Sequence, residues 1–216
     1  MITEYLAEKD KSFVVIPEIS APLSGYRMIN SGGIEVEVGE FLYGLIRVTR
    51  PDNILETGTH YGVGASFMGQ ALKDNGAGHL VTLEFIPEIQ QAASTRIDTM
   101  GLGGQVESVL IDAALYEPKC KYQLMLIDTE PQTRFAEVIK YFPYLEKGGY
   151  LFIHDLHPHM GQVAGPEGYE FGWPFGAIPQ QIKDWVKDGE LRPFHLRTPR
   201  GLFGMYRPAD TDYKWL

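Results

Sequence analysis

The feature that most constrains the fold is a regular alternation of short apolar runs and segments of helical spacing between residues 53 and 155. The strand-like runs are residues 53–56, 79–84, 105–112, 123–128 and 150–155. The helix-like segments are residues 39–50, 63–73, 87–101 and 133–149. Strands that alternate with helices predict βαβ units and a mostly parallel sheet. Such sheets bind ligands beyond the carboxyl ends of their strands, so functional residues are expected there.

The two ends of the chain have a different pattern. Residues 1–38 are broken by glycine and proline, which predicts irregular structure. After a glycine-, proline- and aromatic-rich stretch at 157–176, a helix is expected at 177–189. Two strand-like runs at 191–198 and 201–208 then predict a closing hairpin, which leaves one strand antiparallel to the others.

Composition limits the function classes. The formal net charge is −9, and an acidic surface repels phosphate backbones and anionic membranes, so neither nucleic acid nor membrane is expected as a partner. Cys120 is the only cysteine, which excludes a disulfide within the chain and favours a reducing, cytoplasmic location. The first residues lack the pattern of a signal peptide, and no apolar run has membrane-spanning length.

Residues 54–66 read ILETGTHYGVGAS, a glycine-rich loop that follows a strand-like run. A phosphate-binding loop of the form G-x-x-x-x-G-K-[ST] requires a lysine, which this loop lacks. Gly58, Gly62 and Gly64 follow a G-x-x-x-G-x-G spacing, whereas the dinucleotide fingerprint is G-x-G-x-x-G. The spacing therefore disfavours a dinucleotide.

The loop suits S-adenosylmethionine, whose amino-acid end carries a carboxylate and an ammonium. Backbone N–H groups of a glycine loop and a helix N-terminus suit the carboxylate, and Glu56 suits the ammonium. Glu84, at the end of the next strand, is placed to accept both ribose hydroxyls. Asp112, after the third strand, is placed to accept from the adenine amine, although an acid there is also a routine helix cap.

Five stretches in order, ILETGTHYGVGAS, HLVTLEFIPE, QVESVLIDA, YQLMLIDTEP and LEKGGYLFIHD, resemble the motifs of class I S-adenosylmethionine-dependent methyltransferases. Within that group the chain looks most like small-molecule O-methyltransferases of the catechol and caffeoyl-CoA kind and their bacterial relatives. The resemblance spans residues 38–156. It implies one Rossmann-like three-layer α/β domain over residues 1–216, with a seven-stranded, mostly parallel sheet and an antiparallel last strand. The cofactor-binding residues that it implies are Glu56, Gly58, Thr59, Gly62, Gly64, Glu84, Asp112, Ala113 and Asp128.

The chemistry is expected at Asp128, His154 and Asp155. In metal-dependent members of the resembled family, the acid at the position of Asp128 is a magnesium ligand, and a second acid ends the fifth strand. The pair His154–Asp155 departs from that pattern, and histidine is an uncommon magnesium ligand. Three interpretations stay open: a site for Mg²⁺ or another divalent cation, His154 as a general base without metal, or His154 pointing into the sheet. Adjacent strand residues face opposite ways, so His154 and Asp155 need not face the same side.

Other functions remain open at this stage. His157 and His159 extend the cluster HDLHPH, which a zinc or iron hydrolase or oxygenase could use. A nicotinamide-dependent oxidoreductase and a non-catalytic cofactor-binding homologue are further alternatives. The acceptor is expected to be a small molecule bound by residues 1–38 and the loop 157–176, whose aromatic residues could instead form a homodimer contact.

Overall fold

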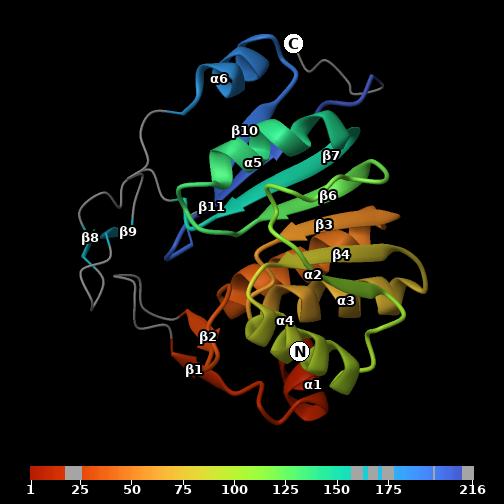
Figure 1. Cartoon of the computed structure of the whole chain (residues 1–216). Helices are drawn as coiled ribbons and strands as arrows, with labels where there is room; N and C mark the ends of the chain where they lie inside the picture. Colours follow the sequence, from red (N-terminus) through yellow and green to blue (C-terminus); the bar gives the residue numbers. More distant parts are fainter. Residues whose placement is uncertain (18–25, 157–162, 165–169, 172–177, 197, 211–216) are drawn as a thin grey trace. The chain divides into compact units, whose positions relative to one another are not determined.

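The computed structural model describes the chain except for residues 18–25, 157–162, 165–169, 172–177, 197 and 211–216. The chain forms two compact units, Met1–Tyr116 and Glu117–Leu216. The main sheet has seven strands, and Figure 1 shows the elements of both units coloured along the sequence. The described helices include none that is long and apolar enough to cross a membrane.

The first unit contributes three parallel strands in the order β3, β4, β5. Their bounds are Asn53–Thr57, His79–Glu84 and Val106–Leu110, and the connecting helices are α3 (Val63–Asn75) and α4 (Pro87–Thr99). The strands and helices that the alternation predicted therefore form here, within a few residues of their expected ends. Strands β3 and β4 are buried almost throughout, as expected for a parallel sheet that is covered on both faces.

Helix α2 (Val36–Thr49) packs along α3 at a glycine. A Cβ on Gly39 would lie 2.3 Å from the ring of Phe67, so only glycine allows the two helices to approach this closely.

The segment before α2 has more structure than its glycines and prolines indicated. It holds the helix α1 (Ile2–Lys9) and two short strands, β1 (Val15–Pro17) and β2 (Arg27–Ile29), which pair antiparallel. Helix α1 was not predicted; its eight residues bury only Thr3 and Leu6, so its apolar signal in the sequence is weak.

The second unit contributes strands in the order β10, β11, β7, β6. Their bounds are Arg192–Leu196, Leu202–Tyr206, Leu145–His154 and Tyr122–Ile127, and the helices are α5 (Arg134–Tyr141) and α6 (Gln180–Lys187). A two-stranded sheet joins β8 (Val163–Ala164) and β9 (Glu170–Phe171). β6 and β7 are parallel, whereas β11 runs antiparallel to both of its neighbours. The predicted hairpin, antiparallel last strand and fold class are confirmed.

The helix predicted at residues 133–149 is wrong in its second half. Helix α5 ends at Tyr141, a 3₁₀ turn covers Phe142–Tyr144, and β7 begins at Leu145. Pro143 lacks the N–H that a continuing helix requires, which ends the helix here. The backbone of Gly148 and Gly149 instead exchanges hydrogen bonds with Arg207 at 2.7 and 2.9 Å, which extends β7 toward the end of β11.

Candidate cofactor site and acidic centre

The glycine loop is fixed to the end of the neighbouring strand. Gly58 and Gly62 have φ angles of +81° and +77°, a region that side chains disfavour. The N–H groups of Gly58 and Thr59 both donate to the carbonyl of Leu83, at 2.9 and 3.0 Å. Helix α3 starts directly after Gly62 without a side-chain cap, so its first N–H groups are suited to an anionic ligand group.

Glu56 lies under this loop and is only 2% exposed. Its Oε2 accepts a hydrogen bond from the Thr82 hydroxyl at 2.5 Å, and that hydroxyl also lies 2.5 Å from the Thr59 hydroxyl. Its Oε1 lies against Gly64. The loop, β3 and β4 therefore hold one buried carboxylate in a fixed position beside the start of α3.

Glu84 ends β4 and organises the backbone around it. Its Oε1 accepts the N–H groups of Phe85 and Ile86 at 2.9 and 3.0 Å, and its Oε2 accepts the N–H of His60 at 2.9 Å. A carboxylate oxygen has two acceptor positions, so the pattern leaves capacity on Oε2 for one further donor. The contact with both ribose hydroxyls that the sequence suggests for Glu84 stays a prediction.

Asp112 has the capping role that the sequence left open. Its Oδ1 accepts the N–H of Ala114 at 2.8 Å, and its carbonyl accepts from Leu115 and Tyr116. Asp112 is exposed, whereas Ala113 is buried. Capping does not remove a binding role, because the second carboxylate oxygen of Asp112 is not used by this turn.

Arg96, on α4, is a residue that the sequence argument missed. It is 7% exposed, and its guanidinium donates to Asp10 (2.9 Å), Ser12 (3.2 Å), Ser31 (3.1 Å) and the carbonyl of Tyr61 (2.7 Å). One side chain thus ties the glycine loop to the N-terminal segment. No signal in the sequence distinguishes it from an ordinary surface arginine on a helix.

A second group of titratable side chains, called the acidic centre below, lies in the second unit. It consists of Asp128, which follows β6, His154, which ends β7, and Asp155, the next residue. Ligand atoms of the three lie within 4.8 Å of one another. The His154 Nδ1 is 3.1 Å from Oδ1 of Asp128 and 3.4 Å from Oδ1 of Asp155, and the ring is fully buried. The strand alternation ends at Asp155, whose φ of +55° is left-handed, and this turn lets its carboxylate reach the side of His154.

Two arginines occupy this acidic centre. Arg134, at the start of α5, places Nη2 3.2 Å from Oδ1 of Asp128 and 3.2 Å from Oδ2 of Asp155. Its Nε donates to the carbonyl of Thr129 at 2.7 Å, and its Nη1 to the carbonyl of His154. Arg200 contacts Asp155 through Nη2 (2.8 Å) and Nε (2.6 Å). Both arginines stand apart from the quoted motifs, so the sequence offered no reason to select them.

The charges act on Asp155 in opposite directions. Burial raises the pKa of its carboxyl, but Arg200, His154 and Arg134 together outweigh burial, so the pKa lies well below its usual range. Asp155 is therefore an ionised partner of the arginines at neutral pH.

The donor set does not fit a magnesium ion. Magnesium prefers near-octahedral oxygen ligands, whereas three of the four carboxylate oxygens of Asp128 and Asp155 already contact guanidinium or imidazole nitrogen. The residues predicted as metal ligands, Asp128, His154 and Asp155, do lie close together, but arginine side chains contact both carboxylates. His157, His159 and the aromatic residues of the loop 157–176 lie outside the residues whose placement or side chains are described.

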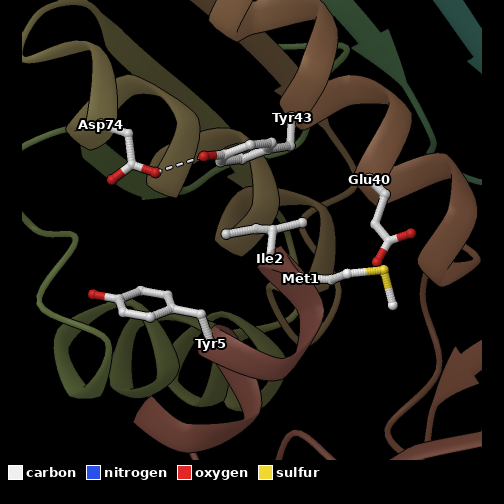
Figure 2. A pocket seen from close by; sticks show the side chains of 6 residues that line it. All are labelled: Met1, Ile2, Tyr5, Glu40, Tyr43 and Asp74. Atoms are coloured by element: carbon white, nitrogen blue, oxygen red, sulfur yellow. Dashed lines mark hydrogen bonds between the residues drawn. The ribbon is translucent and has the colours of Figure 1, made fainter.

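A separate open cavity of about 530 Å³ lies between α1, α2 and α3. Figure 2 shows the Tyr43 hydroxyl directed at Asp74, with Met1, Ile2, Tyr5 and Glu40 around it. The two acids are engaged: Asp74 accepts from Tyr43 and Gln70, both at 2.7 Å, and Glu40 accepts from Thr3 at 2.5 Å. The cavity is thus distinct from the glycine loop and lacks an unpaired acid.

Comparison with known proteins agrees with this fold and loop. Residues 55–156 match the family described as "Methyltransferase domain". A relative from Mycobacterium sp. (strain KMS), provisionally named an O-methyltransferase, is 26% identical over 187 residues, which are 83% of this chain and 81% of the relative. A catechol O-methyltransferase from Niastella koreensis is 29% identical over 131 residues, 58% of each chain.

Solved structures share the fold. The O-methyltransferase TomG from Streptomyces achromogenes, in complex with SAM, has a TM-score of 0.68 and 16% identity, over 96% of this chain and 89% of that chain. Residues 55–156 therefore match the methyltransferase domain that the motifs predicted, and the fold is shared with solved methyltransferases. By this domain the chain is a methyltransferase enzyme.

Proposed function

We propose that this methyltransferase transfers the methyl group of S-adenosylmethionine to a hydroxyl of a small molecule. The observation that carries the proposal is the glycine loop with two fixed carboxylates, Glu56 beside the start of α3 and Glu84 at the end of β4. The mycobacterial and Niastella relatives, which are named for O-methyl transfer, support a hydroxyl as the acceptor.

The cofactor residues have distinct roles in this proposal. The first N–H groups of α3, opened by Gly62 and Gly64, face the cofactor carboxylate, and Glu56 balances its ammonium. Glu84 accepts one ribose hydroxyl on Oε2. Asp112 and Ala113 border the adenine, and Gly58 and Thr59 shape the loop.

Methyl transfer is an in-line displacement. The acceptor oxygen forms the bond to the methyl carbon, the bond from carbon to sulfur breaks, and its electron pair stays on sulfur, which becomes a neutral thioether. The cofactor carries the reactive group, so the protein mainly aligns the two reactants and excludes water.

The hydroxyl proton must leave, and Asp128 is the proposed acceptor. Among the described residues, no hydrogen bond or ion pair reaches its Oδ2, whereas its Oδ1 is held by His154 and Arg134. The His154 ring is fully buried and directed at the carboxylates. A role in orienting Asp128 suits that burial better than direct contact with the acceptor. Asp155 orients the centre through its arginines. Asp128 is also proposed, from the family resemblance, as a cofactor contact.

The setting of the protein is proposed from composition. A net charge of −9 and a single, exposed cysteine support a cytoplasmic enzyme that acts without nucleic acid. A homodimer is compatible with the aromatic residues of 157–176.

Calorimetric titration of S-adenosylmethionine into the wild type and Glu84→Gln tests the proposal. Glutamine keeps one acceptor oxygen but loses the charge and an acceptor for a backbone N–H, so at least a tenfold weaker affinity is expected. Glu107→Gln, an exposed acid on β5, is the control and should bind as the wild type does. Absence of cofactor binding to the wild type would refute the proposal; equal affinity of wild type and Glu84→Gln would refute the role of Glu84.

A further inference from the structure

The acidic centre of the second unit is balanced by its own side chains. Asp128 and Asp155 contribute two negative charges, and Arg134 and Arg200 contribute two positive charges within 3.2 Å of them. The side chains of Arg134, Asp128 and Asp155 are 5%, 13% and 10% exposed, so solvent screens these pairs little. A divalent cation would enter a centre that has no net negative charge to attract it.

Arg134 occupies the position that a bridging cation would need. Its Nη2 is equally far from one oxygen of each carboxylate, 3.2 Å in both contacts. The remaining guanidinium nitrogens donate to the backbone carbonyls of Thr129 and His154, just past the end of β6 and at the end of β7. A planar guanidinium with every nitrogen engaged is a fixed part of the fold.

We infer that Arg134 and Arg200 replace a divalent metal in this centre, so that Asp128, His154 and Asp155 form a metal-independent positioning network. Arg134 bridges the two carboxylates, Arg200 holds Asp155, and Oδ2 of Asp128 is left to meet the acceptor. The inference rests on the proposed function only for that last role. Whether the centre binds a divalent metal is a separate property, which does not depend on the proposed methyl transfer.

Manganese binding, followed by electron paramagnetic resonance of free Mn²⁺ after chelator treatment and dialysis, tests the inference. The wild type is expected to leave millimolar Mn²⁺ free. The double variant Arg134→Gln, Arg200→Gln uncovers two carboxylates beside His154 and is expected to bind Mn²⁺ at least tenfold more tightly. Arg192→Gln, which removes an exposed guanidinium from β10, is the matched control and should behave as the wild type does.

Further measurements distinguish the effect of removing a positive charge from the effect of disturbing the fold. Arg134→Lys keeps the positive charge and is expected to keep Mn²⁺ out, as the wild type does. Circular dichroism identifies a variant that has not folded, in which case Arg134→Lys and the single variant Arg200→Gln are compared. Specific Mn²⁺ binding by the wild type at micromolar concentration would overturn the inference. Wild-type and arginine variants that all leave Mn²⁺ free would overturn the claim that the arginines keep it out. Cofactor titration in parallel shows whether the proposed function fails separately.

Discussion

The carboxylate of Glu56 fills the space that a side chain at residue 64 would need. Its Oε1 lies 2.3 Å from the position of a Cβ on Gly64. The acid at the end of β3 and the second residue of α3 are therefore complementary in shape: the carboxylate requires the glycine beside it.

Gly64→Ala is expected to lower the free energy of unfolding by about 1–3 kcal/mol, the usual cost of overpacking a filled site. It should also weaken S-adenosylmethionine binding, because the displaced Glu56 can no longer face the cofactor ammonium. Urea denaturation and calorimetry measure the two effects. Gly44→Ala, in α2, is the control: apart from its chain neighbours and the backbone of its own helix, no described atom lies within 4 Å of a Cβ placed there, so removing a helical glycine should stabilise by about 0.5–1 kcal/mol. Equal effects of both substitutions would contradict the steric argument.

Arg96→Met removes the guanidinium that joins Asp10 to the carbonyl of Tyr61. Breaking a buried ion pair leaves an uncompensated carboxylate, so a loss of about 3–5 kcal/mol in unfolding free energy is expected. Cofactor affinity should fall as well, since Tyr61 belongs to the glycine loop. Lys73→Met, whose exposed ammonium donates to Gly101, should change stability by less than about 1 kcal/mol. If Arg96→Met is as stable as the wild type, the contacts of Arg96 with Asp10 and Tyr61 do not contribute to stability.

Asp10 gives the protein an acid-sensitive contribution to stability. Burial raises the pKa of its carboxyl, but hydrogen bonds from Ser12 and Arg96 lower it further than burial raises it, so the net shift is downward. A carboxyl whose pKa is lower in the folded than in the unfolded protein stabilises the folded state at every pH above the unfolded pKa, here 3.8. That stabilisation is lost as the pH falls through the folded pKa. Melting temperatures are measured between about pH 2 and pH 6. As the pH decreases, the melting temperature of Asp10→Asn should decrease less than that of the wild type. Parallel curves would remove Asp10 as a contributor.

The sequence predicted those parts of the protein that depend on periodicity and on glycine. The strand ends predicted at Glu56, Glu84, Asp112 and Asp128 lie within two residues of the observed ends, Thr57, Glu84, Leu110 and Ile127, because apolar runs of a parallel sheet are continuous and stop near a polar residue. The helix at 133–149 was overextended because Leu145 and the residues after it fit a helix or a strand equally well.

The arginine contacts could not be predicted. Arg96 lies 86 residues from Asp10 in sequence, and Arg200 lies 45 residues from Asp155. Nothing local distinguishes a buried arginine from an exposed one, because the pairing depends on how distant segments fold together. The sequence therefore selected the acids of the centre but not their partners, and the partners decide between metal chemistry and an internal ion network.

Tyr43 should titrate at an alkaline pH above that of an ordinary tyrosine. Burial raises the pKa of its hydroxyl, and the hydrogen bond with Asp74 and the charge of that carboxylate raise it further. Asp74→Asn removes the charge and should lower the pKa of Tyr43, although burial keeps it above the usual value. Absorbance at the phenolate band, taken as the difference between each protein and its Tyr43→Phe partner, isolates this one group. A titration of Tyr43 that is the same with and without Asp74 would show that burial alone sets the pKa, and that the pair in Figure 2 does not persist in solution.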